Sequence, residues 1–254
     1  MQSVQDPVNT LARERYFMET TQQTGAIVTG ASSGIGLGVT QALLQRGWRV
    51  VATSRMISNS RDLKPSPDLV LVDGDAGKKE TAVKVVEAAL KHFGRIDLLV
   101  NDVGIYLPKA FTDYTEEDYN LVMNTNVASF FYMTQQVIPQ MKKQRSGHVV
   151  NISAVFVGGS ALLAVLSKST MPAVSQALAQ DYAANNIRFN TVSPAVINTP
   201  MHAQADHAAV AKLHPLGRIG EVSDIVDAVL YLQNATFVTG ENIRVDGGAH
   251  AGRQ

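Results

Sequence analysis

The stretch Thr29-Gly30-Ala31-Ser32-Ser33-Gly34-Ile35-Gly36 decides the fold of this chain. It follows a short apolar run, Ala26-Ile27-Val28, and leads into a helical pattern that begins at Leu37. A strand, a glycine-rich turn and a helix in this order bring main-chain N–H groups and a partial positive charge to one point, which suits a pyrophosphate. The spacing is G-x-x-x-G-x-G and not the G-x-G-x-x-G of the commoner dinucleotide fingerprint. Taken alone, the pattern leaves a plain glycine-rich corner between a strand and a helix as the alternative.

Composition narrows the function classes. The chain has 254 residues, enough for one α/β domain with a large buried core. Its 22 basic and 22 acidic residues balance, and no basic patch indicates a nucleic-acid partner. The absence of cysteine excludes disulfides, thiolate chemistry and cysteine-based metal sites. The six histidines show neither H-x-x-x-H nor H-E-x-x-H spacing, so no metal site is expected.

Residues 1–23 are predicted to form an N-terminal extension, and residues 24–254 a single domain. The extension carries charged residues such as Arg13 and Glu14 and has no apolar core, so it does not resemble a signal peptide. The longest mostly apolar stretch, 154–166, is interrupted by glycine and serine and is too short to span a membrane. A soluble, cytoplasmic protein without a membrane partner is therefore expected.

Strand-like apolar runs alternate with helical patterns along the domain, which is typical of a parallel sheet built from βαβ units. Strands are expected near residues 25–29, 48–53, 69–72, 97–101, 147–152, 187–192 and 242–245. Helices are expected near residues 34–46, 77–93, 116–144, 161–185 and 221–233. The predicted fold class is α/β: a three-layer αβα, Rossmann-like, doubly wound parallel sheet of seven strands. The segment 195–215 follows the sixth strand, where ligands bind in such sheets, and is expected to form a substrate lid.

The glycine-rich turn resembles that of the short-chain dehydrogenase/reductase family, and further motifs extend the resemblance over roughly residues 24–249. They occur in the family's order and at its spacing: Gly94-Arg95-Ile96-Asp97-Leu98-Leu99-Val100-Asn101-Asp102-Val103-Gly104, Asn124-Thr125-Asn126-Val127, Gly147-His148-Val149-Val150-Asn151-Ile152-Ser153, Ile187-Arg188-Phe189-Asn190-Thr191-Val192-Ser193-Pro194 and Val245-Asp246-Gly247-Gly248. The resemblance implies an NAD(P)-binding Rossmann domain and oxidoreductase chemistry.

The end of the second predicted strand indicates which nicotinamide cofactor is used. NAD-binding folds place an acidic residue there to accept the ribose hydroxyls, whereas this chain has Ser54 and Arg55. A carboxylate would repel a 2′-phosphate, and a hydroxyl with a guanidinium attracts one. The sequence therefore predicts NADP(H), with a solvated surface arginine as the alternative reading of Arg55.

The resemblance also assigns cofactor contacts residue by residue. The glycine-rich turn would hold the phosphates, two residues would border the adenine, two would pass beneath the adenosine ribose, and four would face the nicotinamide end. In that order these are Gly30, Ser32, Ser33, Gly34, Ile35 and Gly36; Asp75 and Ala76; Asn101 and Gly104; Lys168, Pro194, Ile197 and Thr199.

Two positions depart from the family's motifs. The usual N-N-A-G reads Asn101-Asp102-Val103-Gly104, and the usual P-G reads Pro194-Ala195. Asp102 is open to two interpretations: a new acid, or a carboxylate in place of a structural amide.

The family's chemistry, by resemblance, uses a tyrosine that gives or takes a proton and a lysine four residues later on the same helix face. The spacing to Asn190 identifies Lys168 as the lysine, and Asn126 matches the asparagine that supports it. The tyrosine position is then Ala164 and the position of the carbonyl-binding serine is Ala154. The proton donor and its partner are therefore expected to be missing.

Several groups could replace the missing tyrosine. Ser153 neighbours the serine position, although successive strand residues face opposite ways. Tyr106 could reach the mouth of the substrate site or could simply form its wall, and Ser167 lies off the face of Lys168. A water in the space left by Ala164, polarised by Lys168, is a further alternative. The expected substrate pocket is apolar and is lined by Tyr106, Ala154, Phe156 and Ala164.

Three functions remain open at this point. The first is an NADP(H)-dependent oxidoreductase with a divergent active site, in which Lys168, Asn126 and Ser153 carry the chemistry on a small or medium apolar carbonyl, imine or activated alkene. The second is a catalytically silent NADP(H)-binding sensor or assembly subunit, and the third is a non-redox cyclase or isomerase.

Assembly is predicted from the helices near 116–144 and 161–185, which pair across a two-fold axis in the related family. Their long apolar faces are expected to support a homotetramer or a dimer. The residues that form these faces are Val122, Phe130, Val137, Leu178 and Tyr182.

Overall fold

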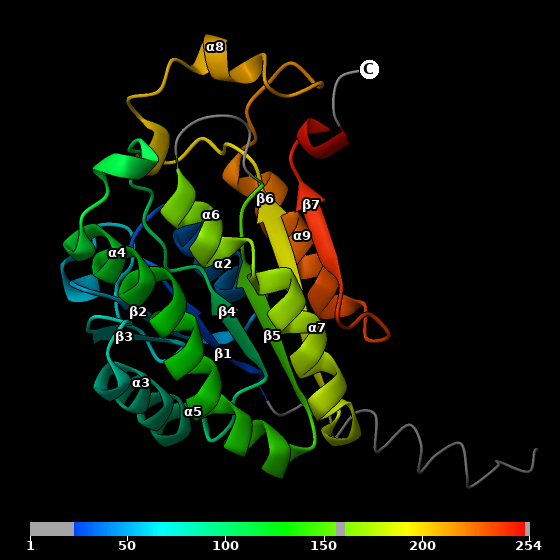
Figure 1. Ribbon diagram of the computed structural model, residues 1–254. Helices are drawn as coiled ribbons and strands as arrows, with labels where there is room; N and C mark the ends of the chain where they lie inside the picture. The colour runs from blue at the N-terminus through cyan, green and yellow to red at the C-terminus, as the bar shows by residue number, and fades with distance from the viewer. Residues whose placement is uncertain (1–22, 156–160, 252–254) are drawn as a thin grey trace, which may run out of the picture.

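A seven-stranded parallel sheet forms the centre of the computed structural model, which describes residues 23–155 and 161–251 (Figure 1). The strands lie in the order β3-β2-β1-β4-β5-β6-β7. Their bounds are β1 (Gly25–Thr29), β2 (Arg49–Ser54), β3 (Leu69–Asp73), β4 (Leu98–Asn101), β5 (Gly147–Ile152), β6 (Ile187–Pro194) and β7 (Asn242–Val245). This order confirms the predicted doubly wound, Rossmann-like sheet. The predicted extension lies, apart from Gln23, outside the described residues.

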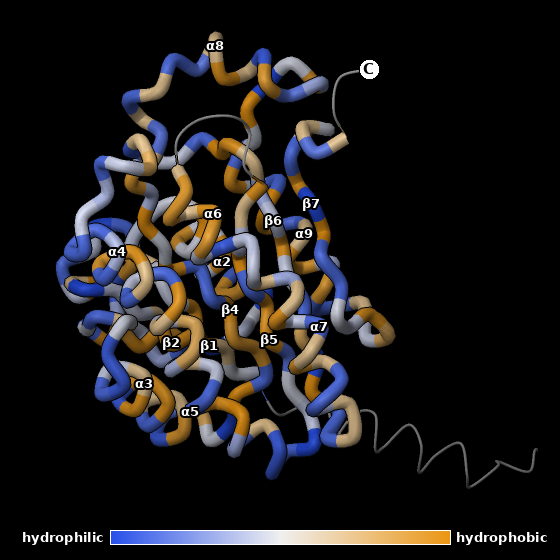
Figure 2. Tube along the Cα trace, in the orientation of Figure 1, coloured by the Kyte–Doolittle hydropathy of each residue, from blue (hydrophilic) through white to orange (hydrophobic). Residues whose placement is uncertain are grey.

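Helices cover both faces of the sheet. Helices α2 (Gly34–Gln45) and α9 (Val222–Asn234) lie on one face, and α3 (Lys79–Phe93), α5 (Ser129–Gln144) and α7 (Met171–Tyr182) lie on the other (Figure 1). Successive strand residues serve the two layers alternately, since Ala26 and Val28 pack with the first layer and Ile27 with the second. Strands buried on both faces need nearly continuous apolar runs, and the central strands in Figure 2 are largely hydrophobic.

The helix predicted at 116–144 contains a π-turn. Helix α4 (Glu116–Met123) passes through the π-turn η3 (Asn124–Ala128) into α5. A π-turn inserts one residue into the helical repeat and often occurs at functional sites. Here the π-turn contains Asn126, so the prediction of one regular helix over 116–144 is wrong at a predicted site residue.

The helix predicted at 161–185 is likewise not continuous. Helix α6 (Leu162–Lys168) ends before α7 begins at Met171, and a 3-10 turn, η4 (Ala183–Asn185), follows α7. Pro172 supplies the physical reason, because it has no N–H group to donate to the carbonyl of Lys168.

The segment 195–215 lies above the carboxyl ends of β5 and β6 (Figure 1), where a lid was expected. It also contains a short helix that the sequence did not predict, α8 (His207–Ala211). The Asp206 carboxylate caps this helix by accepting from the N–H groups of Ala208 and Ala209. Within residues 23–155 and 161–251, no helix is long and apolar enough to cross a membrane.

Candidate active site

A cavity of about 560 Å³ opens at the carboxyl ends of the strands, the edge at which open α/β sheets bind ligands. It brings together most of the residues singled out from the sequence. The predicted residues that line it are Gly30, Ser32, Ser33, Gly34, Ile35, Ser54, Arg55, Asp75, Ala76, Gly104, Tyr106, Ser153, Ala154, Ala164, Lys168, Pro194, Ile197 and Thr199. Gly36, Asn101 and Asn126 do not line it, and Phe156 lies outside the described residues.

The glycine-rich turn forms one end of the cavity. Gly30 and Gly34 have φ angles of +70° and +55°, a conformation that glycine adopts without steric cost. A Cβ on Gly36 would lie 2.5 Å from the Gly30 carbonyl oxygen, so a side chain there would push the turn apart. The Ser33 side chain makes no capping hydrogen bond at the start of α2. The first turn of this helix can therefore present N–H groups to an anion.

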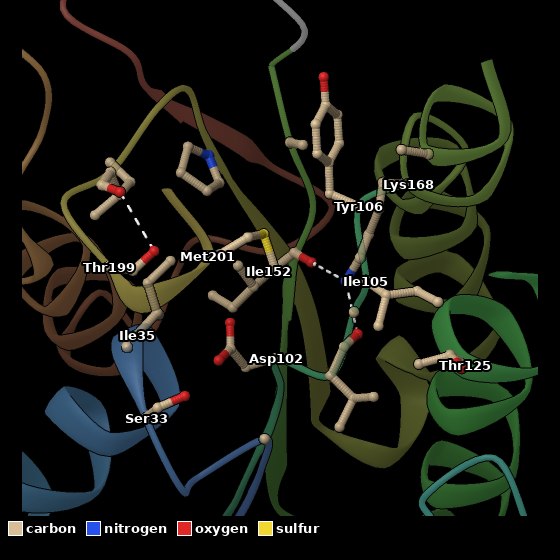
Figure 3. A pocket seen from close by; sticks show the side chains of 18 of the residues that line it. Ser33, Ile35, Asp102, Ile105, Tyr106, Thr125, Ile152, Lys168, Thr199 and Met201 are labelled. Atoms are coloured by element: carbon tan, nitrogen blue, oxygen red, sulfur yellow. Dashed lines mark hydrogen bonds between the residues drawn. The ribbon is translucent and has the colours of Figure 1, made fainter. Parts of the chain in front are cut away.

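Asp102 lines the cavity beside this turn (Figure 3). Its Oδ2 accepts a hydrogen bond from the Gly36 N–H at 2.8 Å, and its own N–H donates to Thr29 Oγ1 at 3.1 Å. Burial raises the pKa of the Asp102 carboxyl to about 7, and the charge of Lys168 opposes that rise. The geometry favours the second interpretation of Asp102, a side-chain oxygen that fixes the turn as an amide oxygen would.

The Lys168 side chain reaches the middle of the cavity from α6. Its Nζ donates to the main-chain carbonyls of Val103 and Ile152, both at 2.9 Å (Figure 3). Burial lowers the pKa of the amine to about 8, against the attraction of Asp102. Gly104 makes this route possible, because a Cβ there would lie 2.8 Å from Lys168 Cε. The structure therefore fixes the amine between the ends of β4 and β5.

Asn126 lies behind Lys168 rather than in the cavity. Its Oδ1 accepts from the Ile105 N–H at 2.7 Å, and its Nδ2 donates to the Ile105 carbonyl at 3.1 Å and to Ser167 Oγ at 2.9 Å. The side chain thus links the π-turn to the loop after β4 and to α6. It holds in place two of the segments that surround the lysine.

The two alanines line the far end of the cavity. Ala164 is 4% exposed and lies one helical turn before Lys168, where the resemblance expects a phenol. The neighbouring Ser153 hydroxyl donates to the main-chain carbonyl of Lys168 at 2.6 Å. The Tyr106 hydroxyl points away from the lysine amine in Figure 3, and its ring lies 6.3 Å from that of His202. Tyr106 is therefore a wall of the cavity in this conformation.

The side chain of Asn101, the last residue of β4, contacts α5 and β5 rather than the cavity. Its Nδ2 donates to Thr134 Oγ1 at 3.1 Å and to Asn151 Oδ1 at 2.9 Å, and Asn151 in turn donates to Ser175 Oγ at 2.9 Å. This buried polar chain ties β4 and β5 to α5 and α7. Sequence reasoning missed it, although asparagine at the end of two adjacent parallel strands was a signal that it could have used.

The end of the cavity at β2 and β3, where the adenosine is expected, carries the predicted selectivity residues. The Ser54 carbonyl accepts from the Gly74 N–H at 3.0 Å, which joins the ends of β2 and β3. The Arg55 side chain is exposed and makes no hydrogen bond or ion pair with another described residue. Asp75 is also exposed, and its Oδ1 accepts from the Gly77 N–H at 2.9 Å. The Arg55 guanidinium is therefore available to a ligand at the cavity edge.

Comparisons with known proteins agree with this geometry. The family model described as "Enoyl-(Acyl carrier protein) reductase" matches residues 30–250. A 3-oxoacyl-[acyl-carrier-protein] reductase, FabG, of Thermotoga maritima is 33% identical over 240 residues, which cover 87% of this chain and 96% of that protein.

Solved structures show the same fold. The 3-ketoacyl-(acyl-carrier-protein) reductase of Brucella melitensis, complexed with NADH, superposes with a TM-score of 0.84 at 27% identity. That match covers 89% of this chain and 98% of the other. ElxO with NADP bound superposes with a TM-score of 0.82 at 24% identity, over 91% of this chain and 100% of that one.

Proposed function

The chain belongs to the short-chain dehydrogenase/reductase family, and on that premise we propose that it is an NADP(H)-dependent oxidoreductase with an atypical active site. The observation that carries the proposal is the Lys168 amine, held by two carbonyls in the same cavity as the uncapped start of α2. Burying a charge costs free energy unless partners hold it. A buried amine with two carbonyl partners therefore favours a working site over a cavity that has lost its function.

The residues present fit a dinucleotide. The glycine-rich turn offers main-chain N–H groups to a pyrophosphate, and Gly36 and Gly30 approach too closely for any side chain to fill the cradle. Arg55 and Ser54 at the cavity edge suit a 2′-phosphate, since guanidinium–phosphate hydrogen bonds are charge-assisted. Lys168 would hold the hydroxyls of the ribose next to the nicotinamide. These features support NADP(H) as the cofactor.

When bound, the nicotinamide supplies or accepts a hydride. The work of this chain is to orient the reactants, exclude water and hold charge. Asn126 keeps the Ile105 loop and α6 in register, and Lys168 places a positive charge where negative charge develops on a reduced substrate atom. Ala154 and Ala164 line the cavity and leave room for a water or a substrate group at the positions where, by resemblance, the family carries its carbonyl-binding serine and its proton-donating tyrosine.

The far end of the cavity supports an apolar substrate. Tyr106, Ala154, Val155 and Ala164 line this end, and an apolar wall favours a small or medium apolar carbonyl, imine or activated alkene. The same alanines support a second candidate function, an NADP(H)-binding protein without redox turnover. A positioned general acid contributes about 10²–10⁴-fold to rate, so its loss can silence ketone reduction.

Two measurements test the proposal. Fluorescence titration should show NADPH binding, and Lys168→Ala should weaken it. A panel of ketones, cyclic imines and activated alkenes should then show NADPH consumption with at least one class that Lys168→Ala abolishes. Binding without turnover on any class favours the silent candidate, and absence of NADPH binding by the folded protein refutes both.

We also propose that the protein is a homotetramer or a dimer. Three of the five residues named from the sequence do not supply the contact, since Val122, Phe130 and Val137 are buried within the domain itself. The other two, Leu178 and Tyr182, are only partly buried. Other apolar side chains on α4, α5 and α6 are exposed instead, by 54%, 51% and 49% for Leu121, Phe131 and Leu166. An isologous contact between copies would remove these side chains from water.

A further inference from the structure

The helix that carries Lys168 is interrupted directly after it. In a regular α-helix the carbonyl of Lys168 would accept from the N–H of residue 172, but Pro172 has no N–H group. Ser169 and Thr170 nevertheless keep right-handed dihedral angles, with φ −67° and ψ −15° at Ser169 and φ −79° and ψ −19° at Thr170. Helices α6 and α7 therefore follow each other closely while the Lys168 carbonyl lacks its helical donor.

The Ser153 hydroxyl takes the place of that donor. It donates to the Lys168 carbonyl with an Oγ···O distance of 2.6 Å. Ser153 itself is well anchored, because it is 5% exposed and its N–H donates to the Val192 carbonyl of β6 at 2.8 Å. The sheet thus supplies, through one side chain, the hydrogen bond that the helix has lost.

Two adjacent residues therefore hold Lys168 at both of its ends. The Ser153 hydroxyl binds the main-chain carbonyl, and the Ile152 carbonyl accepts from Nζ at 2.9 Å. A long side chain that is held both at its main chain and at its tip loses most of its rotamer freedom. The amine is thereby held at one point of the cavity before any ligand arrives.

From these contacts we infer that Ser153 is a positioning residue for Lys168, needed because Pro172 removes the helical donor to the Lys168 carbonyl. Ser153 lines the cavity, but its hydroxyl hydrogen is directed to the lysine main chain and not to a substrate. This assignment differs from the catalytic role expected from the sequence. It rests on the proposed function only in that Lys168 serves the nicotinamide end of the site.

A double-mutant cycle in the cofactor-free protein tests the pairing. Ser153→Ala removes the hydroxyl, and we expect the equilibrium constant of urea unfolding to rise roughly tenfold, the usual consequence of stranding a buried acceptor. Pro172→Ala restores an N–H at the second position of α7. In that background Ser153→Ala should change the equilibrium constant about twofold or less. Ser169→Ala, at an exposed serine of the same junction, is the matched control and should have little effect in either background.

The second readout concerns the amine itself. This readout uses an Asp102→Asn background, because Asp102 lines the same cavity and its pKa is raised toward neutrality by burial. The affinity for NADPH should then fall as pH rises through the pKa of Lys168, which burial holds below its ordinary value. Loosening the lysine in Ser153→Ala returns the amine to water, so the midpoint of this fall should move to higher pH. Pro172→Ala combined with Ser153→Ala should move it back, and Ser169→Ala should leave it unchanged.

The outcomes separate this inference from the proposed function. Equal effects of Ser153→Ala in the unmodified protein and in the Pro172→Ala background overturn the pairing, as does an unchanged midpoint in a Ser153→Ala protein that binds NADPH. If the cofactor-free cycle shows the coupling but no variant binds NADPH, the positioning role stands and the proposed function fails.

Discussion

Replacing Asp102 by asparagine should make the protein more stable at neutral and alkaline pH. In the unmodified protein the Gly36 N–H donates to Asp102 Oδ2 at 2.8 Å. Asparagine keeps the shape of the side chain and an oxygen that can accept the same hydrogen bond. The substitution removes a carboxylate whose pKa burial raises to about 7 from the ordinary value of 3.8, with Lys168 opposing the rise. The variant therefore isolates the cost of ionising this buried group.

The direction of the pH dependence follows from proton uptake. In the unfolded chain Asp102 releases its proton near pH 3.8, whereas in the folded protein it keeps the proton until about pH 7. Between these values the unfolded state binds fewer protons, so the unfolding free energy falls as pH rises. The stabilising contribution is full below pH 3.8, is lost across this window, and changes no further above it.

The size of the effect can be bounded. One pKa unit corresponds to about 1.4 kcal/mol, so a shift of about three units gives at most about 4 kcal/mol. Partial exposure of Asp102 to the cavity and the coupling to Lys168 reduce this figure, and about 2 kcal/mol is the expected difference. Asp102→Asn should thus exceed the unmodified protein in unfolding free energy by about 2 kcal/mol at pH 8 and by much less at pH 4.5.

Urea unfolding at a series of pH values from 4.5 to 8 measures this difference directly. Asp75→Asn is the matched control, because Asp75 is an exposed acid that lines the same cavity. It should shift stability by a similar small amount at every pH. A difference between Asp102→Asn and the unmodified protein that stays constant with pH would refute the reasoning, since it would mean that the carboxyl is not protonated in the folded state near neutrality.

Three further predictions concern the cofactor, the reaction and assembly. NADPH should bind more tightly than NADH by about 1–3 kcal/mol, and Arg55→Asp should invert that preference in a titration; equal affinities that the substitution leaves unchanged contradict the NADP(H) proposal. Simple ketones should be reduced very slowly, and Ala164→Tyr with Ala154→Ser should raise the rate at least about tenfold in a spectrophotometric assay. Fast ketone reduction that survives Lys168→Ala would show that the reaction does not take place at Lys168. Light scattering at micromolar concentration should report a tetramer or a dimer, and a monomer there would count against the assembly proposal.

Local patterns in the sequence were enough to determine the sheet and the glycine-rich turn. Each predicted strand coincides with an observed one to within two residues. The central strands are buried on both faces and therefore require runs of apolar residues. The turn was equally legible, since Gly30, Gly34 and Gly36 occupy positions that other residues cannot take without strain or overlap.

The helices were predicted less well for a local reason and a non-local one. The break after Lys168 could have been predicted from Pro172. This proline lies four residues after the lysine, at the position whose N–H would bind the Lys168 carbonyl in a continuous helix. The π-turn at Asn126 had no comparable signal, because an inserted residue changes the helical repeat only when neighbouring elements favour it. Burial of Val122, Phe130 and Val137 likewise depends on which helices pack beside them.

The chemistry of the site was decided by the tertiary structure. Asp102 receives its hydrogen bond from Gly36, which is 66 positions away, and the Ser153 hydroxyl meets a carbonyl 15 positions away. The sequence could name these residues, because residue types and spacings are local. It could not give the pKa of Asp102 or the direction of the Ser153 hydroxyl, because burial and hydrogen-bond partners arise only when distant segments pack together.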